Sequence, residues 1–172
     1  MAYAIGFFVL QRRICCESGF INIDGVLNDD STPTRTKSRF VFIDWEKLLR
    51  LKQIVDATGA EIVLSSTWRY DRDNPQYNGD FLELQEVFRQ VGLSFYSFTP
   101  VDVYGIRRGM EIRAWLGLHP EVDRYIILDD ELFDFEQRGL LPRLIRTEFG
   151  DGGLTDAHVQ EAIEMLSDDL DN

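Results

Sequence analysis

Residues 20–28 have the sequence Phe-Ile-Asn-Ile-Asp-Gly-Val-Leu-Asn. The apolar residues in this stretch predict a buried β-strand over residues 20–23, and Asn22 and Asp24 lie at its carboxyl end. Because side chains alternate along a strand, residues 22 and 24 are expected on the same side. A strand that ends in polar groups is typical of an open α/β sheet with a functional site at its carboxyl edge.

Apolar strand-like runs alternate with amphipathic helical runs through the rest of the chain, which indicates a mainly parallel sheet. Further strands are predicted over residues 61–65, 93–98, 124–128 and 144–147. Helices are predicted over residues 44–58, 80–91, 109–116 and 155–166. Asp80 is expected to cap the second of these helices, with Glu83 three residues later.

The first predicted helix has an apolar side and a glycine at its end. Gly59 is expected to stop it. Its buried side is predicted to consist of Trp45, Leu48, Leu49 and Val55. The polar stretch that precedes it, over residues 28–38, contains a proline and is expected to be an exposed loop.

Length and composition favour one soluble domain, since the chain has 172 residues, 44% of them hydrophobic and 28% charged. The net charge of −12 argues against tight, sequence-independent binding to a nucleic-acid backbone, although a local basic patch remains compatible with it. The two cysteines are adjacent at positions 15 and 16, which gives no disulfide framework. We therefore expect a reducing, cytoplasmic location.

The N-terminal stretch over residues 2–10 is apolar and is followed by Gln-Arg-Arg. It is shorter than the ~20 residues that a membrane span needs, and its charges lie on the wrong side for a signal peptide. We predict no membrane association and an extra strand or arm within an N-terminal extension, residues 1–19. The main domain is predicted over residues 20–166, with an acidic tail over residues 167–172.

Polar groups are predicted at four places along one edge of this sheet. Their order along the chain is an acidic-type pair, hydroxyl groups, cations and a second acidic pair. The residues are Asn22 and Asp24; Ser65, Ser66 and Thr67; Arg107 and Arg108; and Asp129 and Asp130. Strand ends bring such distant groups together, so we expect Asn22 and Asp129 to lie close enough to share one Mg²⁺.

This order resembles the four motifs of the haloacid dehalogenase (HAD) superfamily. The closer resemblance is to the compact HAD-like domains of Swiss-army-knife RNA repair proteins, whose motifs correspond to residues 22–28, 62–69, 108–116, 128–130 and 153–155. The block Ser-Ser-Thr-Trp-Arg is the most specific of these motifs. The resemblance implies a Rossmannoid three-layer sandwich and a Mg²⁺-dependent phosphatase that works through an aspartyl-phosphate intermediate.

The resemblance also implies roles for the residues near the metal. Asp24 would be the general acid and base, and its backbone carbonyl would bind Mg²⁺. Asp129 would ligate Mg²⁺ directly, and Asp130 would reach it through water or orient its ligands. Asn22 occupies the position of the nucleophile, where the family has an aspartate.

For the phosphate, the resemblance implies a hydroxyl group and a cation. Ser66 is preferred to Ser65 for the hydroxyl, with Thr67 next to it, although the two serines are almost equally suitable. Arg108 would stabilise the aspartyl phosphate, with Arg107 as the alternative.

Asn22 is the one departure from the motif, and an amide oxygen is a poor nucleophile. Two explanations compete: an introduced Asp-to-Asn change that stops turnover, or a natural pseudo-phosphatase that binds phosphorylated ligands or partners without catalysis. We favour the introduced change, because Asp24, Ser66, Arg108 and Asp129 are all in place.

The predicted loops leave no room for a sizeable cap domain, so the site is expected to be open. An open site favours a phosphate on a large substrate, such as an RNA or DNA end. A basic rim of arginines and lysines is one candidate contact surface for it, with Trp68 and Tyr70 as stacking groups. The alternative is that Trp68 packs under its loop and the arginines pair with acids. The residues of the rim are Arg35, Lys37, Arg39, Arg69, Arg72, Arg107, Arg108 and Arg113.

Overall fold

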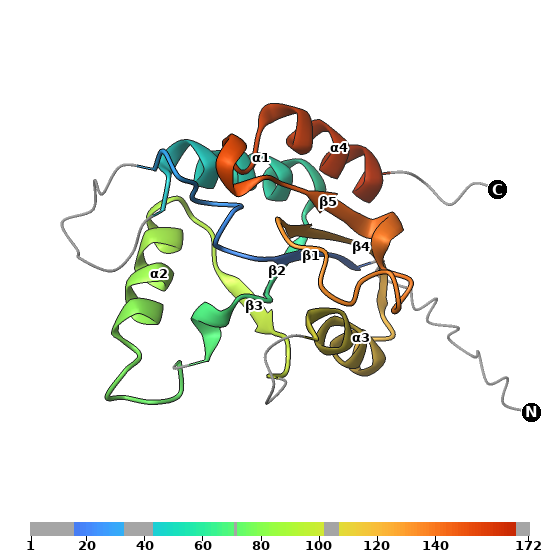
Figure 1. Cartoon of the computed structure of the whole chain (residues 1–172), viewed down its shortest axis with the longest axis horizontal. Coiled ribbons are helices and arrows are strands. Elements are labelled where there is room, and N and C mark those ends of the chain that lie inside the picture. The colour runs from blue at the N-terminus through green and yellow to red at the C-terminus, as the bar shows by residue number, and fades with distance from the viewer. Residues whose placement is uncertain (1–15, 33–42, 71, 102–106, 168–172) are drawn as a thin grey trace, which may run out of the picture.

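The computed structural model describes residues 16–32, 43–70, 72–101 and 107–167 (Figure 1). They form a five-stranded sheet in the order β3-β2-β1-β4-β5, in which every strand pairing is parallel. This confirms the predicted α/β class with a mainly parallel sheet. The strand order is that of a Rossmann-like fold, in which the direction of winding reverses beside β1.

All five strands were predicted from the sequence, with differences at their ends. Strand β1 begins at Cys16 and ends at Ile21, so residues 16–19 belong to the sheet and not to a separate extension. The start of this strand was not predicted from the sequence, because neither Ser18 nor Gly19 is a strong strand former. The strands are β1 (Cys16–Ile21), β2 (Glu61–Leu64), β3 (Phe95–Phe98), β4 (Val122–Asp129) and β5 (Leu144–Arg146).

The helices are α1 (Trp45–Thr58), α2 (Gly79–Gln90), α3 (Arg108–Leu118) and α4 (Asp156–Ser167). Asp44 caps α1 by accepting a hydrogen bond from the Glu46 amide at 2.9 Å, and Gly59 ends it with a φ of 74°. The predicted cap of α2 was wrong, because Asp80 lies in the first turn and Asn78 precedes the helix. Thr155 precedes α4, and its hydroxyl accepts a hydrogen bond from the His158 amide at 3.4 Å.

The predicted buried side of α1 was partly wrong. Leu48 is fully buried, but Trp45 is 48% exposed and Leu49 is 38% exposed. The helix instead buries Leu51 and Ile54, which lie three and six residues beyond Leu48 and therefore share its side of the helix.

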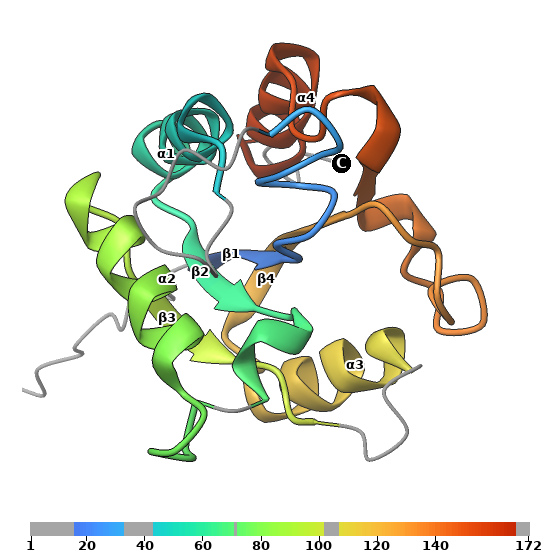
Figure 2. The same ribbon diagram turned by 60° about the vertical axis from the view of Figure 1, so that its left-hand side comes forward.

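Helices cover both faces of the sheet (Figures 1 and 2), and apolar side chains pack between the helices and the strands. The larger cluster joins α1, α2 and α4 to one face and includes Ile21, Leu64 and Leu128. The smaller cluster joins α3 to the other face and includes Phe20 and Ile127. Alternate residues of each central strand therefore point to opposite layers, and this alternation decides the direction of the side chains at the strand ends.

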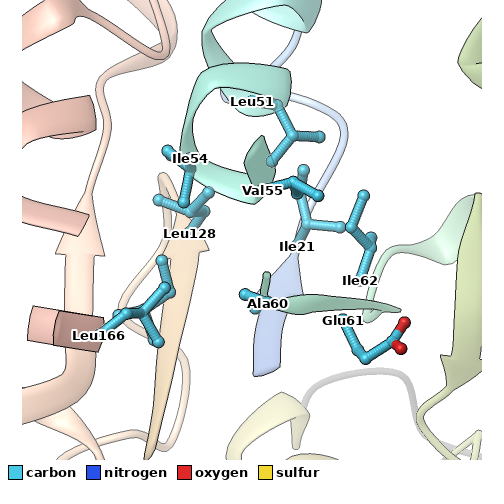
Figure 3. Close-up of a pocket in the computed structure, with 11 residues that line it drawn as sticks. Ile21, Leu51, Ile54, Val55, Ala60, Glu61, Ile62, Leu128 and Leu166 are labelled. Atoms are coloured by element: carbon cyan, nitrogen blue, oxygen red, sulfur yellow. The ribbon is translucent and has the colours of Figure 1, made fainter. Parts of the chain in front are cut away.

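A small pocket lies in the larger apolar layer, between α1, α4 and the sheet (Figure 3). Its walls include Ile21, Ile54, Leu128 and Leu166, and Glu61 is the one charged residue at its margin. Such a lining offers packing space and no chemistry.

The loop after β1 differs from its prediction. Asn28 and Asp29 were expected in an exposed loop, but each is only 7% exposed. The predicted N-terminal arm over residues 2–10, residues 33–38 of the loop and residues 168–172 of the acidic tail lie outside the described residues. The described residues form a single sheet with its helices, and none of them builds a separate cap. None of the described helices is long and apolar enough to cross a membrane.

Candidate active site at the carboxyl ends of the central strands

Three polar residues lie side by side where the central strands end. Ile21 pairs with Leu64 on one side and with Leu128 on the other, so Asn22, Ser65 and Asp129 follow at adjacent positions. Two backbone hydrogen bonds of 2.9 Å continue the pairing, from the Asn22 amide to the Leu128 carbonyl and from the Ser65 amide to the Ile21 carbonyl. This is the point where strand order reverses, the usual place for a ligand in such a sheet.

These three residues share one face of the sheet. Phe20, Val63 and Ile127, each two residues earlier, all belong to the cluster beneath α3. The period of two along a strand therefore directs the following polar residues to the side of α3. Helix α3 begins at Arg108, so its first residue meets the polar strand ends.

The Asn22 amide group lies among three oxygen atoms. Its Nδ2 donates hydrogen bonds to the Asp24 carbonyl oxygen at 2.9 Å, to Asp130 Oδ1 at 3.1 Å and to Asp129 Oδ1 at 3.4 Å. Its Oδ1 accepts a hydrogen bond from the Ile23 amide at 2.9 Å, which fixes which end of the side chain points inward. The expected approach of residues 22 and 129 is therefore present in the structure.

Arg108 and Asp129 form a buried ion pair. Arg108 Nη1 donates to Asp129 Oδ2 at 2.7 Å, and the side chains are 8% and 1% exposed. Burial raises the pKa of Asp129 to about 6, although Arg108 acts in the opposite direction. Burial also raises the pKa of Asp130. The positive charge of Arg108 therefore does not fully offset the cost of burying these two carboxylates.

Phe133 completes the surroundings of Arg108. The guanidinium carbon of Arg108 lies 4.3 Å from the centre of the Phe133 ring, which is cation–π geometry. Phe133 has a φ of 39°, and no other non-glycine residue in the described ranges has a positive φ. A bulky residue in this conformation costs about 1–2 kcal/mol. The loop after β4 therefore holds the ring against Arg108 in a strained conformation.

Asp24 is half-buried, and both of its carboxyl oxygens accept hydrogen bonds. Asn28 Nδ2 donates to Oδ1 at 3.0 Å, and Trp68 Nε1 donates to Oδ2 at 3.0 Å. The indole ring of Trp68 also packs against the larger apolar cluster. Trp68 therefore packs beneath its loop, as the alternative prediction had it, and its N–H group points to Asp24.

The hydroxyl groups after β2 have different surroundings. Ser65 Oγ accepts a hydrogen bond from Thr99 Oγ1 at 3.3 Å, beside the end of β3. Ser66 instead caps the short 3₁₀ helix η1 (Thr67–Arg69), where its Oγ accepts from the Trp68 amide at 3.4 Å. Thr67 is exposed. The hydroxyl group at the strand end beside Asn22 thus belongs to Ser65, whereas the preferred Ser66 lies in the turn that follows.

Arg69 was predicted in a basic rim, and this was wrong. The residue is 1% exposed, and its Nη2 lies 2.6 Å from Glu111 Oε2 in α3. It also donates to the backbone carbonyls of Ser66, Thr99 and Pro100. Arg69 therefore fastens the ends of β2 and β3 to α3.

The remaining arginines of the predicted rim are distributed differently. Arg107 is exposed next to the site. Arg113 is also exposed, but it donates to the carbonyls of Arg138 and Gly139 at the edge of α3. Arg72 is half-buried and pairs with Asp73 at 3.0 Å. Residues 35, 37 and 39 lie outside the described part of the chain.

A second buried ion pair supports the loop after β1. Lys47 Nζ lies 2.9 Å from Asp29 Oδ2 and 3.0 Å from Asp44 Oδ2, and its side chain is 6% exposed. Burial tends to raise the pKa of Asp29, but the hydrogen bonds from Lys47 and Ser31 outweigh it and lower the pKa to about 2. This ion pair was not predicted from the sequence, because its members lie in a loop and a helix that meet only in the folded chain.

The oxygen atoms around the Asn22 amide fit a hard divalent cation. Mg²⁺ prefers carboxylate and carbonyl oxygens, and the Asp24 carbonyl, Asp129 and Asp130 supply them. No group of three or more His, Cys, Asp or Glu side chains in the described ranges is placed to hold a metal. Residue 22 places an amide nitrogen among these oxygens, where an aspartate would place a fourth oxygen.

Comparison with known proteins identifies the family. The profile of the HAD domain in Swiss Army Knife RNA repair proteins matches residues 20–159. The chain belongs to this family. A search of curated proteins found no match. Membership supports a phosphatase-type hydrolase in an RNA repair context, and the matched range contains every site residue described above.

Proposed function

We propose that this HAD domain is a Mg²⁺-dependent phosphohydrolase site for nucleic-acid ends, in which Asn22 stands at the position of the nucleophile. The observation that carries the proposal is the ring of three oxygens around the Asn22 amide, next to Asp24 and the Arg108–Asp129 pair. Removing a phosphate needs an in-line nucleophile, positive charge for its oxygens and a proton for the leaving group.

The chain supplies two of these three requirements. Asp24 is the proton donor, because its half-buried carboxyl group lies beside residue 22 and is held by Asn28 and Trp68. Arg108 supplies positive charge, and only one of its five N–H donors is needed for the bond to Asp129. Ser65 is our candidate for the phosphate hydroxyl, with Ser66 shaping the turn after it.

The Asp24 carbonyl and side-chain oxygens of Asp129 and Asp130 would hold Mg²⁺, and residue 22 would add an oxygen when it is an aspartate. When bound, the ion would neutralise charge on the phosphate oxygens and orient them. The raised pKa of Asp129 has the same physical origin as the need for a cation, namely buried negative charge.

Asn22 does not supply the remaining requirement, which is the nucleophile. An amide has no anionic oxygen to attack phosphorus, and its inward-facing atom is the nitrogen. The chain with Asn22 is therefore expected to be inactive as a phosphatase, whether the asparagine is introduced or natural.

A large substrate suits the surroundings of the site. The described residues contain no cap over the strand ends. Arg107 and Tyr70 are exposed beside α3 and η1, and the tyrosine ring is one surface on which a base can stack. The overall charge of −12 makes the local cations more important for recognising an RNA or DNA end.

The test is to restore the carboxylate. The Asn22→Asp variant should release phosphate from RNA or DNA oligonucleotides with a 3′ or 5′ terminal phosphate, in the presence of Mg²⁺ and not of EDTA. Asn74→Asp is the matched control, because Asn74 is an exposed turn residue that caps the Gln76 amide. An Asn22→Asp protein without activity on these oligonucleotides and on aryl phosphates would refute the proposal.

Binding without catalysis is a second candidate, and the same amide favours it. Asn22 satisfies the three oxygens by hydrogen bonds, so the site needs no metal to be stable. In that case the chain with Asn22 should bind a phosphorylated oligonucleotide more tightly than its unphosphorylated form. Ser65→Ala should weaken that preference, and equal affinity for the two forms would exclude this function.

A further inference from the structure

The carboxyl group of Asp24 is held on both sides by neutral donors. Asn28 Nδ2 and Trp68 Nε1 each lie 3.0 Å from one of its oxygens. A carboxyl group has about four lone-pair positions, so two such bonds leave room for a proton and for a substrate. They do fix the plane of the group, which a single bond does not.

Asn28 is itself held in one orientation. Its Oδ1 accepts a hydrogen bond from the Gly25 amide at 3.0 Å, so its NH₂ group must face Asp24. The turn that brings Asn28 back depends on Gly25, which has a φ of 72°. A Cβ at this position would also lie only 2.3 Å from Asp130 Cγ. Gly25 thus allows the chain to turn so that the side-chain amide of Asn28 reaches the Asp24 carboxyl group.

Trp68 approaches from the other side and is held by its own turn. Ser66 Oγ caps η1 and accepts from the Trp68 amide. The indole ring packs against the larger apolar cluster, so the N–H group has little freedom. Ser66, Trp68 and Asp24 therefore form a connected series from the end of β2 to the end of β1.

We propose that Trp68 and Asn28 are positioning residues that hold the Asp24 carboxyl group for proton transfer to the leaving oxygen of a phosphate ester. This inference rests on the proposed function. It assigns the tryptophan of the Ser-Ser-Thr-Trp-Arg block to the chemistry of Asp24 and not to base stacking.

The reaction that this arrangement serves can be written for the Asn22→Asp variant. A carboxylate oxygen at position 22 attacks phosphorus, the bond from phosphorus to the ester oxygen breaks, and the proton of Asp24 moves to that oxygen. Asp24, now a carboxylate, takes a proton from water as the water attacks the phosphorus of the aspartyl phosphate, and the bond from phosphorus to the carboxylate oxygen of residue 22 breaks. Inorganic phosphate leaves, and both side chains return to their starting forms.

The experiment uses two esters of similar size that differ in their need for a proton. Phenoxide is a poor leaving group, whereas 2,4-dinitrophenoxide leaves without protonation. In the Asn22→Asp background, Trp68→Phe should lower kcat/KM for phenyl phosphate about 10-fold or more, since general acids contribute ~10²–10⁴-fold. We compare kcat/KM because it reports transfer of the phosphoryl group to residue 22, whereas kcat also includes the hydrolysis step that both esters share. For 2,4-dinitrophenyl phosphate the loss should stay below about 2-fold.

Trp115→Phe is the matched control. Trp115 is 2% exposed, and its Nε1 donates to Ser97 Oγ at 2.9 Å in the smaller apolar cluster beneath α3. This substitution also removes a buried indole hydrogen bond, but the partner of that bond is Ser97 and not Asp24. It should therefore affect the two esters equally. Equal losses for both esters in Trp68→Phe, with an active Asn22→Asp parent, would overturn the inference alone. An inactive parent would overturn the proposed function and this inference with it.

A second measurement uses the chain with Asn22 and requires no activity. The protein has three tryptophans, so each indole N–H resonance in an NMR spectrum can be assigned by substitution. Asp24→Asn should shift the Trp68 indole resonance more than those of Trp45 and Trp115. An unmoved Trp68 resonance would overturn the contact on which the inference depends.

Discussion

Asn22→Asp should make the stability of this domain depend on Mg²⁺. The asparagine donates to one carbonyl and two carboxylate oxygens at 2.9–3.4 Å, and each bond to a charged group is worth ~1.5–3 kcal/mol. A carboxylate at position 22 removes these bonds and brings like charges together. At an effective dielectric constant of ~20, two full charges about 3 Å apart repel by roughly 5 kcal/mol.

Movement of the side chains and uptake of a proton will reduce this repulsion. We therefore expect a net loss of about 3 kcal/mol in the unfolding free energy without metal. For a domain of this size, that loss corresponds to a fall in Tm of ~6–12 °C. Mg²⁺ at 100 times its Kd should return about 2.7 kcal/mol.

The assay is thermal unfolding of both proteins in EDTA and in Mg²⁺, followed by circular dichroism. The parent with Asn22 should unfold at almost the same temperature in both solutions, and so should the Asn74→Asp control. An Asn22→Asp protein as stable as the parent in EDTA would contradict the predicted repulsion between residue 22 and its acidic neighbours. An equal effect of Mg²⁺ on all three proteins would refute the predicted metal binding at residue 22.

Three further predictions concern groups around the site. The pKa of Asp29 falls from 3.8 to about 2 on folding. Its ionised form therefore stabilises the protein by ~2 kcal/mol above pH 4. This contribution is lost as the pH falls from about 4 to about 2. Asp29→Asn should remove that part of the pH dependence in urea titrations, and an unchanged acid limb would count against the Lys47 pair. Arg69→Met should cost ~3–5 kcal/mol because it leaves Glu111 buried without its cation. Arg89→Met, in a solvent-exposed pair, should leave the unfolding free energy almost unchanged. Urea denaturation measures both, and similar small losses would mean that Arg69 is not the clamp described here. Phe133→Leu in the Asn22→Asp background should raise KM for a phosphorylated oligonucleotide ~3–10-fold, because the cation–π contact to Arg108 is lost; an unchanged KM would show that the ring does not position Arg108.

The sequence predicted the sheet well because its strands have strong local patterns. Apolar runs such as residues 61–64 and 124–128 are evident without any tertiary information, and polar groups at their ends were predicted at the site. The start of β1 was missed because Ser18 and Gly19 interrupt the apolar pattern, although Ser18 is 1% exposed between two neighbouring strands.

The errors at the site come from contacts between distant segments. Arg69 looks like a surface cation in the sequence, and only its distance of 2.6 Å to Glu111, 42 residues later, makes it a buried clamp. Trp68 lies 44 residues from Asp24, so its indole N–H had no predicted partner. Phe133 has a positive φ that no local preference would suggest. Such features depend on how loops pack at the strand ends, which periodicity does not describe.

The most direct test of the account is whether position 22 accepts a phosphoryl group beside a metal. Trifluoroberyllate mimics the phosphoryl group of an aspartyl phosphate, and its binding is measured by ¹⁹F NMR without knowledge of the natural substrate. We predict a bound signal for the Asn22→Asp protein with Mg²⁺, no bound signal after EDTA, and none for the chain with Asn22. A bound signal of equal strength in the chain with Asn22, or no signal in the variant with Mg²⁺, would contradict the assignment of residue 22 as the position of the nucleophile.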